Sequence, residues 1–266
     1  MIKKLIISNA LIALLSWQFF RYVDYVLNII TPESFSFDFE PAAVINFVIL
    51  TSIVSLALPL FRKRRWALAS SGIVGVIFLS FFGFTYINLV GVLIAVALFE
   101  YARFVGVEEI DQRTKINSRM IVRRGATGVV LAFFVLISFA AYQSPVAKGI
   151  AEAEQLPSAT QQLTRSIVDS VIGTTETQKK TENTEKEKIV NEITGNVFQR
   201  LNSILKPYFQ YAPPLLAFGL FLILWGLSWL FVWLSVLVGM GIFWLLKKTN
   251  MVRIEKRNVE AEILEI

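Results

Sequence analysis

The sequence predicts an all-α protein: a polytopic bundle of six transmembrane helices with a helical hairpin outside the membrane. Hydrophobic residues make up 55% of the 266 residues and charged residues 17%, a balance typical of polytopic membrane proteins. Six apolar runs are long enough to cross a hydrocarbon core of about 30 Å. Lys and Arg also collect in the segments that six crossings place on one side.

The six predicted spans are separated by short connections, except before the last one. They cover residues 5–28, 42–61, 66–82, 85–102, 126–142 and a stretch within 214–246. Gly83 predicts a tight hairpin between the third and fourth spans. Residues 100–124, which contain many charges, are interpreted as a partly amphipathic connector between the fourth and fifth spans.

The distribution of basic residues predicts that both termini lie in the cytoplasm. Basic segments are Lys3–Lys4, RKRR at 62–65, residues 100–124 and residues 247–266. The short segments that would lie outside, 31–41 and the turn around Gly83, contain neither Lys nor Arg. Short cytoplasmic loops are enriched in Lys and Arg, so this asymmetry favours six crossings over an odd number.

Basic residues at the predicted inner rim are candidates for contacts with anionic lipid headgroups. They are Arg62, Lys63, Arg64, Arg65, Arg123 and Arg124. The alternative is that this rim docks an acidic cytoplasmic partner. Because topology accounts for where the basic residues lie, we do not interpret the net charge of +6 as a nucleic-acid interface.

Residues 143–213 are the only sizeable segment predicted outside the membrane, and they are interpreted as a helical hairpin. The polar, low-complexity residues 174–188 predict a mobile tip. Val190, Val197 and Ile204 repeat every seven residues, which is typical of a helical seam. The seam would close the hairpin on itself, pair two subunits or contact a partner in the cell envelope. The predicted regions are a five-span part, 1–142, the hairpin, 143–213, a long sixth span, 214–246, and a cytoplasmic tail, 247–266.

The sixth span is too long for the membrane and carries an unusual row of tryptophans. Residues 214–246 would form about 50 Å of helix, against about 30 Å of hydrocarbon. We therefore expect protein to cover 214–224, either the outer hairpin, a second subunit, or the segment with Phe35, Phe37 and Phe39.

Trp225, Trp229 and Trp233 recur every fourth residue, so they share one face of the sixth span. This row would pack against other spans of the same chain, form a seam between subunits, or line a hydrophobic cavity for lipid. Small residues that could receive the rings are Ser71, Gly75, Gly125 and Gly128.

The second span carries the most extended polar face of any span. The polar residues are Asn46, Thr51, Ser52 and Ser55. They would form interhelical hydrogen bonds next to a proline kink, or they would line a pore together with the region around Arg21.

The composition argues against an enzyme. The chain has no Cys and no His, so thiol nucleophiles, thiolate metal sites and the commonest general base are missing. No P-loop, GxSxG motif or zinc-ligand spacing occurs, and no carboxylate pair lies at the middle of a span. We therefore expect no catalytic residue, no cofactor and no metal.

Two segments, RRGATGVVLAFFVLISFAAYQSP at 123–145 and MVRIEKRNVEAEIL at 251–264, resemble parts of uncharacterised polytopic membrane proteins of small-genome bacteria. The resemblance implies a bacterial inner membrane and no particular activity. The function we expect is a structural or assembly component that acts as a homo-oligomer or within a membrane complex. An oligomeric pore lined by the second span is the alternative.

Overall fold

The computed structural model describes residues 2–29, 40–60, 64–112, 118–152, 194–201, 203–204 and 206–249. All of the elements among these residues are helices, so the predicted all-α class is confirmed. The chain divides into two compact units. The first comprises Met1–Val23, Glu40–Phe139 and Phe221–Ile266; the second comprises Asp24–Phe39 and Ala140–Leu220.

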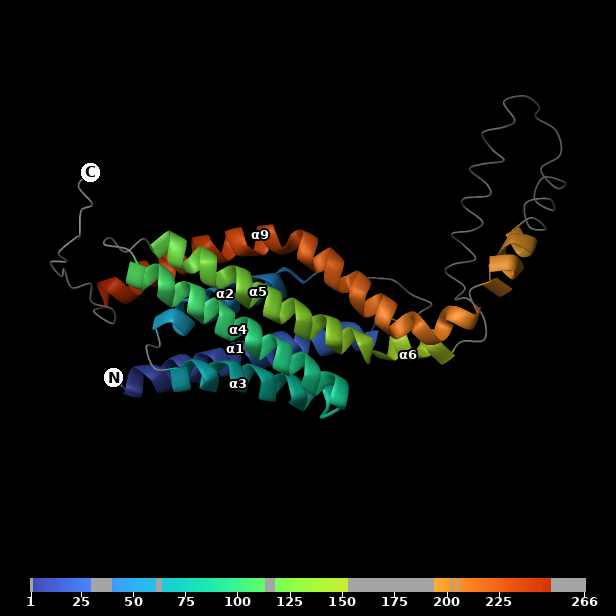
Figure 1. The fold of residues 1–266 in the computed structure, drawn as a ribbon, viewed down its shortest axis with the longest axis horizontal. Helices are drawn as coiled ribbons and strands as arrows, with labels where there is room; N and C mark the ends of the chain where they lie inside the picture. Colours follow the sequence, from blue (N-terminus) through green and yellow to red (C-terminus); the bar gives the residue numbers. More distant parts are fainter. Residues whose placement is uncertain are drawn as a thin grey trace, which may run out of the picture. The chain divides into compact units, whose positions relative to one another are not determined.

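Six helices are long and apolar enough to cross a membrane, as the sequence predicts. They are α1 (Ile2–Ile29), α2 (Pro41–Leu60), α3 (Arg64–Phe82), α4 (Tyr86–Gln112), α5 (Ser118–Tyr142) and α9 (Ala212–Lys248). Most of their length forms the helix bundle of the first unit (Figure 1).

Two of these helices extend well beyond the predicted spans. The fourth span was expected to end at residue 102, yet α4 continues to Gln112, and α5 begins at Ser118 rather than at residue 126. Most of the predicted connector, 100–124, is therefore helical, and both helices run beyond the predicted span ends. Helix α4 continues beyond its apolar part because neither Gly nor Pro follows Gly106 before the helix ends, and Glu109 is paired with Arg124 of α5.

The turn between α3 and α4 has the tight geometry expected of it. Gly83 has φ = 84°, a left-handed conformation that L side chains rarely adopt. Its N–H donates to the carbonyl oxygen of Leu79 at 2.9 Å. The Asn88 Nδ2 group donates to the carbonyl oxygens of Phe82 and Gly83, which satisfies acceptors left open where α3 ends.

A cluster of phenylalanine rings fills the middle of the bundle. Phe133 of α5 is fully buried, and four rings have centroids 5.7–6.1 Å from its own. They belong to Phe19, Phe20, Phe47 and Phe99. Since these residues come from α1, α2 and α4, the cluster ties four helices together.

Glycines bring α5 close to its neighbours. A Cβ atom added at Gly128 would lie 2.8 Å from the Cβ atom of Ala102 on α4. One added at Gly125 would lie 3.0 Å from the carbonyl oxygen of Ser55 on α2. Both positions therefore require the absence of a side chain.

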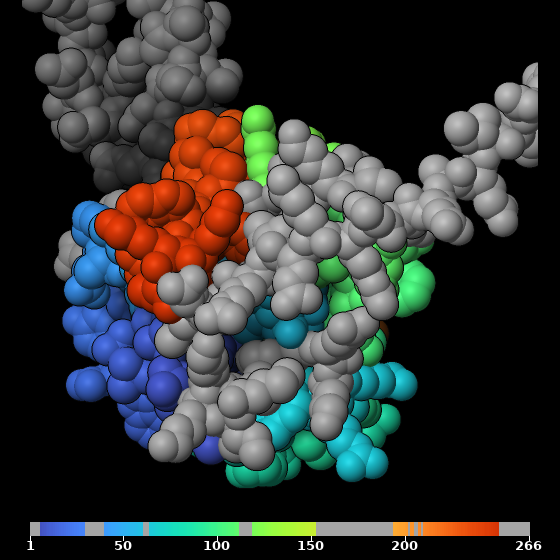
Figure 2. Space-filling view, turned by 90° about the vertical axis from the view of Figure 1, so that its left-hand side faces the viewer, coloured from blue at the N-terminus to red at the C-terminus, as the bar shows by residue number. Residues whose placement is uncertain are grey.

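The start of α1 and the end of α9 lie at the same end of the first unit (Figure 1). Arg64 at the start of α3, Arg123 and Arg124 near the start of α5, and Lys247 at the end of α9 belong to this end as well. We call it the basic end. Viewed from there, α9 lies on the edge of the bundle beside α2 (Figure 2).

The second unit contains α6 (Pro145–Glu152), helical residues 194–201 and a 3₁₀ helix, η1 (Lys206–Tyr211), and α6 packs against η1. The predicted tip, 174–188, and Val190 lie outside the described residues. Val197 and Ile204 are 38% and 62% exposed. Their pairing in a seam stays a prediction.

Candidate functional site

The polar face of α2 contacts α9. Thr51, Ser52 and Ser55 are fully buried. The Oγ1 atom of Thr51 lies 2.7 Å from the Oγ atom of Ser235 on α9, within hydrogen-bond distance. The Ser52 hydroxyl donates to the Ser235 carbonyl oxygen at 3.0 Å and to the Val48 carbonyl oxygen at 2.6 Å. These side chains join two helices inside the bundle.

The other polar residues of α2 also bond to protein within the single chain. The Ser55 hydroxyl donates to the Ser52 carbonyl oxygen at 3.0 Å, within the same helix. Asn46 is partly buried, and its Nδ2 group donates to the Leu15 carbonyl oxygen of α1 at 3.4 Å. In the single chain these hydroxyl groups are buried and hydrogen-bonded to protein. An oligomeric pore lined by Thr51, Ser52 and Ser55 stays a prediction.

Around this polar contact, α9 packs on the bundle along a narrow stripe. Val236 is buried together with Leu56 of α2 and Val122 of α5. A Cβ atom added at Gly239 would lie 2.7 Å from the Cγ1 atom of Val122, so α9 lies close to α5 there. Only Ser235, Val236 and Gly239 are buried among the described residues of α9.

The tryptophans of α9 do not pack between spans of this chain. Trp225, Trp229 and Trp233 are 57%, 68% and 55% exposed, so the intrachain interpretation was wrong. The small residues expected to receive them are already in contact with other residues. Gly75 of α3 lies against Val92 of α4, and the two glycines of α5 lie against α2 and α4. A seam between subunits stays a prediction.

The apolar residues before these tryptophans are exposed too. Leu215, Phe218 and Ile223 are 63%, 60% and 64% exposed. The described residues of the same chain thus leave these side chains exposed, and cover by the outer hairpin, most of which lies outside the described residues, stays a prediction. The proposed cover by Phe35, Phe37 and Phe39 lies outside the described residues, and cover by a second subunit stays a prediction.

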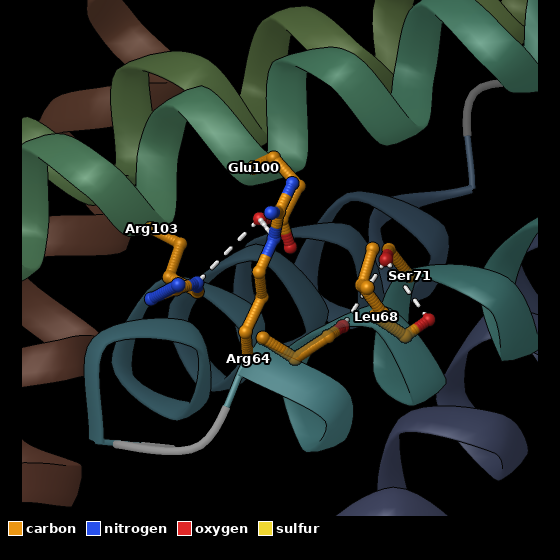
Figure 3. Close-up of polar contacts among 6 residues, drawn as sticks. Arg64, Leu68, Ser71, Glu100 and Arg103 are labelled. Atoms are coloured by element: carbon orange, nitrogen blue, oxygen red, sulfur yellow. Dashed lines mark hydrogen bonds and ion pairs between the residues drawn. The ribbon is translucent and has the colours of Figure 1, made fainter.

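Two groups of ion pairs stabilise the basic end. In the first, the Oε2 atom of Glu100 lies 3.1 Å from the Nε atom of Arg64 and 3.6 Å from that of Arg103 (Figure 3). In the second, the Oε2 atom of Glu109 lies 3.0 Å from the Nη1 atom of Arg124. The Glu109 side chain is only 3% exposed, and the pair connects α4 to α5.

The sequence-based predictions did not single out Arg103, Glu109 or Ser235. The first two were overlooked because α4 was expected to end at residue 102. A helix that runs to Gln112 would have placed a carboxylate at 109 where it could meet the start of α5. Ser235 is the lone polar residue between Trp233 and Met240. A single polar residue in such an apolar stretch often bonds to another helix, and this pattern could have identified Ser235 from the sequence.

Of the basic residues predicted at the rim, Arg62 and Lys63 lie outside the described residues. Arg65 and Arg123 are exposed. Arg64 and Arg124 are exposed as well, and they are paired with Glu100 and Glu109. Within the described ranges, no group of three or more carboxylate, His or Cys side chains could hold a metal ion.

No family model, curated protein or solved structure matches this chain. The class of this protein is therefore inferred from its own helices. Six apolar helices of membrane-crossing length, with their charged residues gathered near the helix ends, make it an integral membrane protein.

Proposed function

We propose that this protein is a non-enzymatic structural or assembly component of a bacterial inner membrane, and that it forms an oligomer through α9. The observation that carries the proposal is the exposure of α9. Within its most apolar window none of the residues is buried, whereas 72% of the corresponding window of α5 is buried.

Lipid alone would be a poor cover for this surface. At 1.5 Å per residue, the 37 residues of α9 extend for about 55 Å, and a bilayer offers about 30 Å of hydrocarbon. Measured back from Lys247, Trp233 lies about 21 Å along the helix. This depth is inside the hydrocarbon core, whereas tryptophans that anchor a span usually lie at the membrane interfaces. A second copy of the chain would cover both the tryptophans and the apolar residues beyond the bilayer.

The oligomer is tested by measuring its mass. The wild-type protein and a variant with Trp229→Leu and Trp233→Leu would be compared in detergent by light scattering and in nanodiscs by native mass spectrometry. We expect a wild-type oligomer and a smaller species for the variant. Trp17→Leu is the matched control, because Trp17 is 51% exposed on a different helix, α1. A monomeric wild-type protein in both environments would refute the proposal.

The proposed orientation places both termini in the cytoplasm and residues 143–213 outside. The chain has no Cys, so single cysteines can be introduced at Thr177 and Asn258 without removing any. We expect an impermeant thiol reagent to label Thr177→Cys in intact cells, and to label Asn258→Cys only after lysis. The reverse pattern would contradict this orientation.

A further inference from the structure

We infer that Arg64, Glu100 and Arg103 form a binding site for the phosphate group of an anionic phospholipid at the basic end of the first unit. Arg64 begins α3, while Glu100 and Arg103 lie one turn apart on α4. The two helices are neighbours, and both arginines approach the same carboxylate oxygen (Figure 3).

The charges of this cluster do not balance. Two guanidinium groups share the single carboxylate of Glu100, which leaves one positive charge in excess. Glu109, further along α4, is paired with Arg124 of α5. The side chains of Arg103 and Glu100 are only 17% and 19% exposed, so water solvates Arg103 poorly, and an anion bound beside it would stabilise its charge.

Two atoms of the cluster lack hydrogen-bond partners within the described part of the chain. They are the Nε atom of Arg103 and the Oε1 atom of Glu100, and both are buried. The 3.6 Å separation between Arg103 Nε and Glu100 Oε2 is too long for a hydrogen bond. The ion pairs within the cluster are thus incomplete, and the guanidinium of Arg64, whose side chain is 69% exposed, can contact a ligand from the bilayer.

The depth of the cluster fits a phosphate layer. Glu100 lies about 21 Å and Arg103 about 26 Å along α4 from Tyr86, which begins the helix at the opposite end. A hydrocarbon core of about 30 Å therefore ends close to Arg103, and the long side chains can reach the headgroups.

The surface beside the cluster is apolar and suits an acyl chain rather than a free ion. On α4, Tyr101 and Phe104 are 61% and 64% exposed. On α3, Leu68 is 39% exposed and lies one turn from Arg64 (Figure 3). Inorganic phosphate would contact only the arginines, whereas a phospholipid would cover these apolar side chains as well.

The experiment measures lipid binding by the full-length protein. Purified protein in a neutral detergent would be titrated with phosphatidylglycerol or with phosphatidylcholine, and the lipid-bound species counted by native mass spectrometry. We expect Arg64→Gln and Arg103→Gln each to weaken phosphatidylglycerol binding about tenfold, the loss of one charged hydrogen bond. Arg123→Gln is the matched control, because this arginine is exposed at the same end and belongs to neither cluster; we expect a change within about twofold.

Two further arms separate the site from its alternatives. Glu100→Gln removes the competing negative charge, so we expect it to bind phosphatidylglycerol at least as tightly as wild type. Millimolar inorganic phosphate should not displace the lipid. The proposal would be overturned if Arg123→Gln weakened phosphatidylglycerol binding as much as Arg64→Gln, or if Arg64→Gln did not weaken it. Weaker binding by Glu100→Gln, or displacement of the lipid by phosphate, would also overturn it. Because Arg64 is largely exposed, Arg64→Gln should fold, which circular dichroism checks.

Discussion

Helices α5 and α9 are both apolar spans of the same bundle, yet α5 lies in its core and α9 on its edge. In α5, Gly125 and Gly128 let α2 and α4 approach until no Cβ atom would fit. In α9, a Cβ atom added at Gly226 or Gly241 would meet nothing within 4 Å, and the tryptophans of this helix are exposed. Hydrophobicity therefore decides that a helix enters the membrane, while residue size decides which helices pack closely, since lipid tails are as apolar as side chains.

The largest difference between the two helices should come from their phenylalanines. Phe133→Ala in α5 would empty the centre of the ring cluster and lower the free energy of unfolding by about 3–5 kcal/mol. Phe218→Ala in α9, where the ring is 60% exposed, should change it by no more than about 0.5 kcal/mol. Equilibrium unfolding of the monomer in mixed micelles measures both values. Equal losses would remove the distinction between the helices.

Adding a methyl group should show the next largest effect. Gly128→Ala places a Cβ atom 2.8 Å from that of Ala102, so the helices must move apart at a cost of about 1–3 kcal/mol. Gly226→Ala in α9 meets nothing within 4 Å and should be neutral or stabilising by up to about 1 kcal/mol. The unfolding assay applies again, and a destabilised Gly226→Ala would show that α9 has a close neighbour there.

The hydrogen bond that joins α9 to α2 should contribute less. Thr51→Val removes the hydroxyl that meets Ser235 and should cost about 0.6–1.7 kcal/mol. Thr127→Val is the control, because this threonine is exposed on α5 and its hydroxyl donates only to the Arg123 carbonyl oxygen of its own helix. A double-mutant cycle with Ser235→Ala measures the coupling between the two hydroxyls. A coupling of zero would mean that the contact does not stabilise the bundle.

The smallest effect on the monomer should come from Trp229→Ala. If Trp229 were buried between spans, its replacement would lower the free energy of unfolding by about 3–5 kcal/mol. The residue is 68% exposed, so we expect this free energy to change by no more than about 0.5 kcal/mol. The measurement is made at a dilution where light scattering shows a monomer. At higher protein concentration, where the oligomer forms, the same substitution should weaken it. The protein concentration at which half of the oligomer has dissociated should therefore rise. A loss of several kcal/mol in the monomer would mean that the ring packs within the chain.

The sequence predicted the spans well because the membrane imposes a strong local rule. A run of about 20 apolar residues with charges at its ends must form a helix there, whatever its neighbours are. The boundaries of α2 and α3 and the turn at Gly83 were accordingly close to those observed. The ends of α4 and α5 were not, because a helix outside the hydrocarbon depends on partners such as the pair formed by Glu109 and Arg124.

By itself, the sequence determined that this chain is helical, that it crosses a membrane, and that thiol and imidazole chemistry are missing. Only the tertiary structure decided which faces meet. The hydroxyls of α2 could have lined a path or bonded another helix, and Ser235, 184 positions from Thr51, gave them a partner. The tryptophans of α9 could have been buried, but the glycines expected to receive them were already packed against α2 and α4. Pairing across such distances in the chain leaves no periodic signal, because each helix needs only to be apolar, and contacts between helices depend on shape and hydrogen bonds.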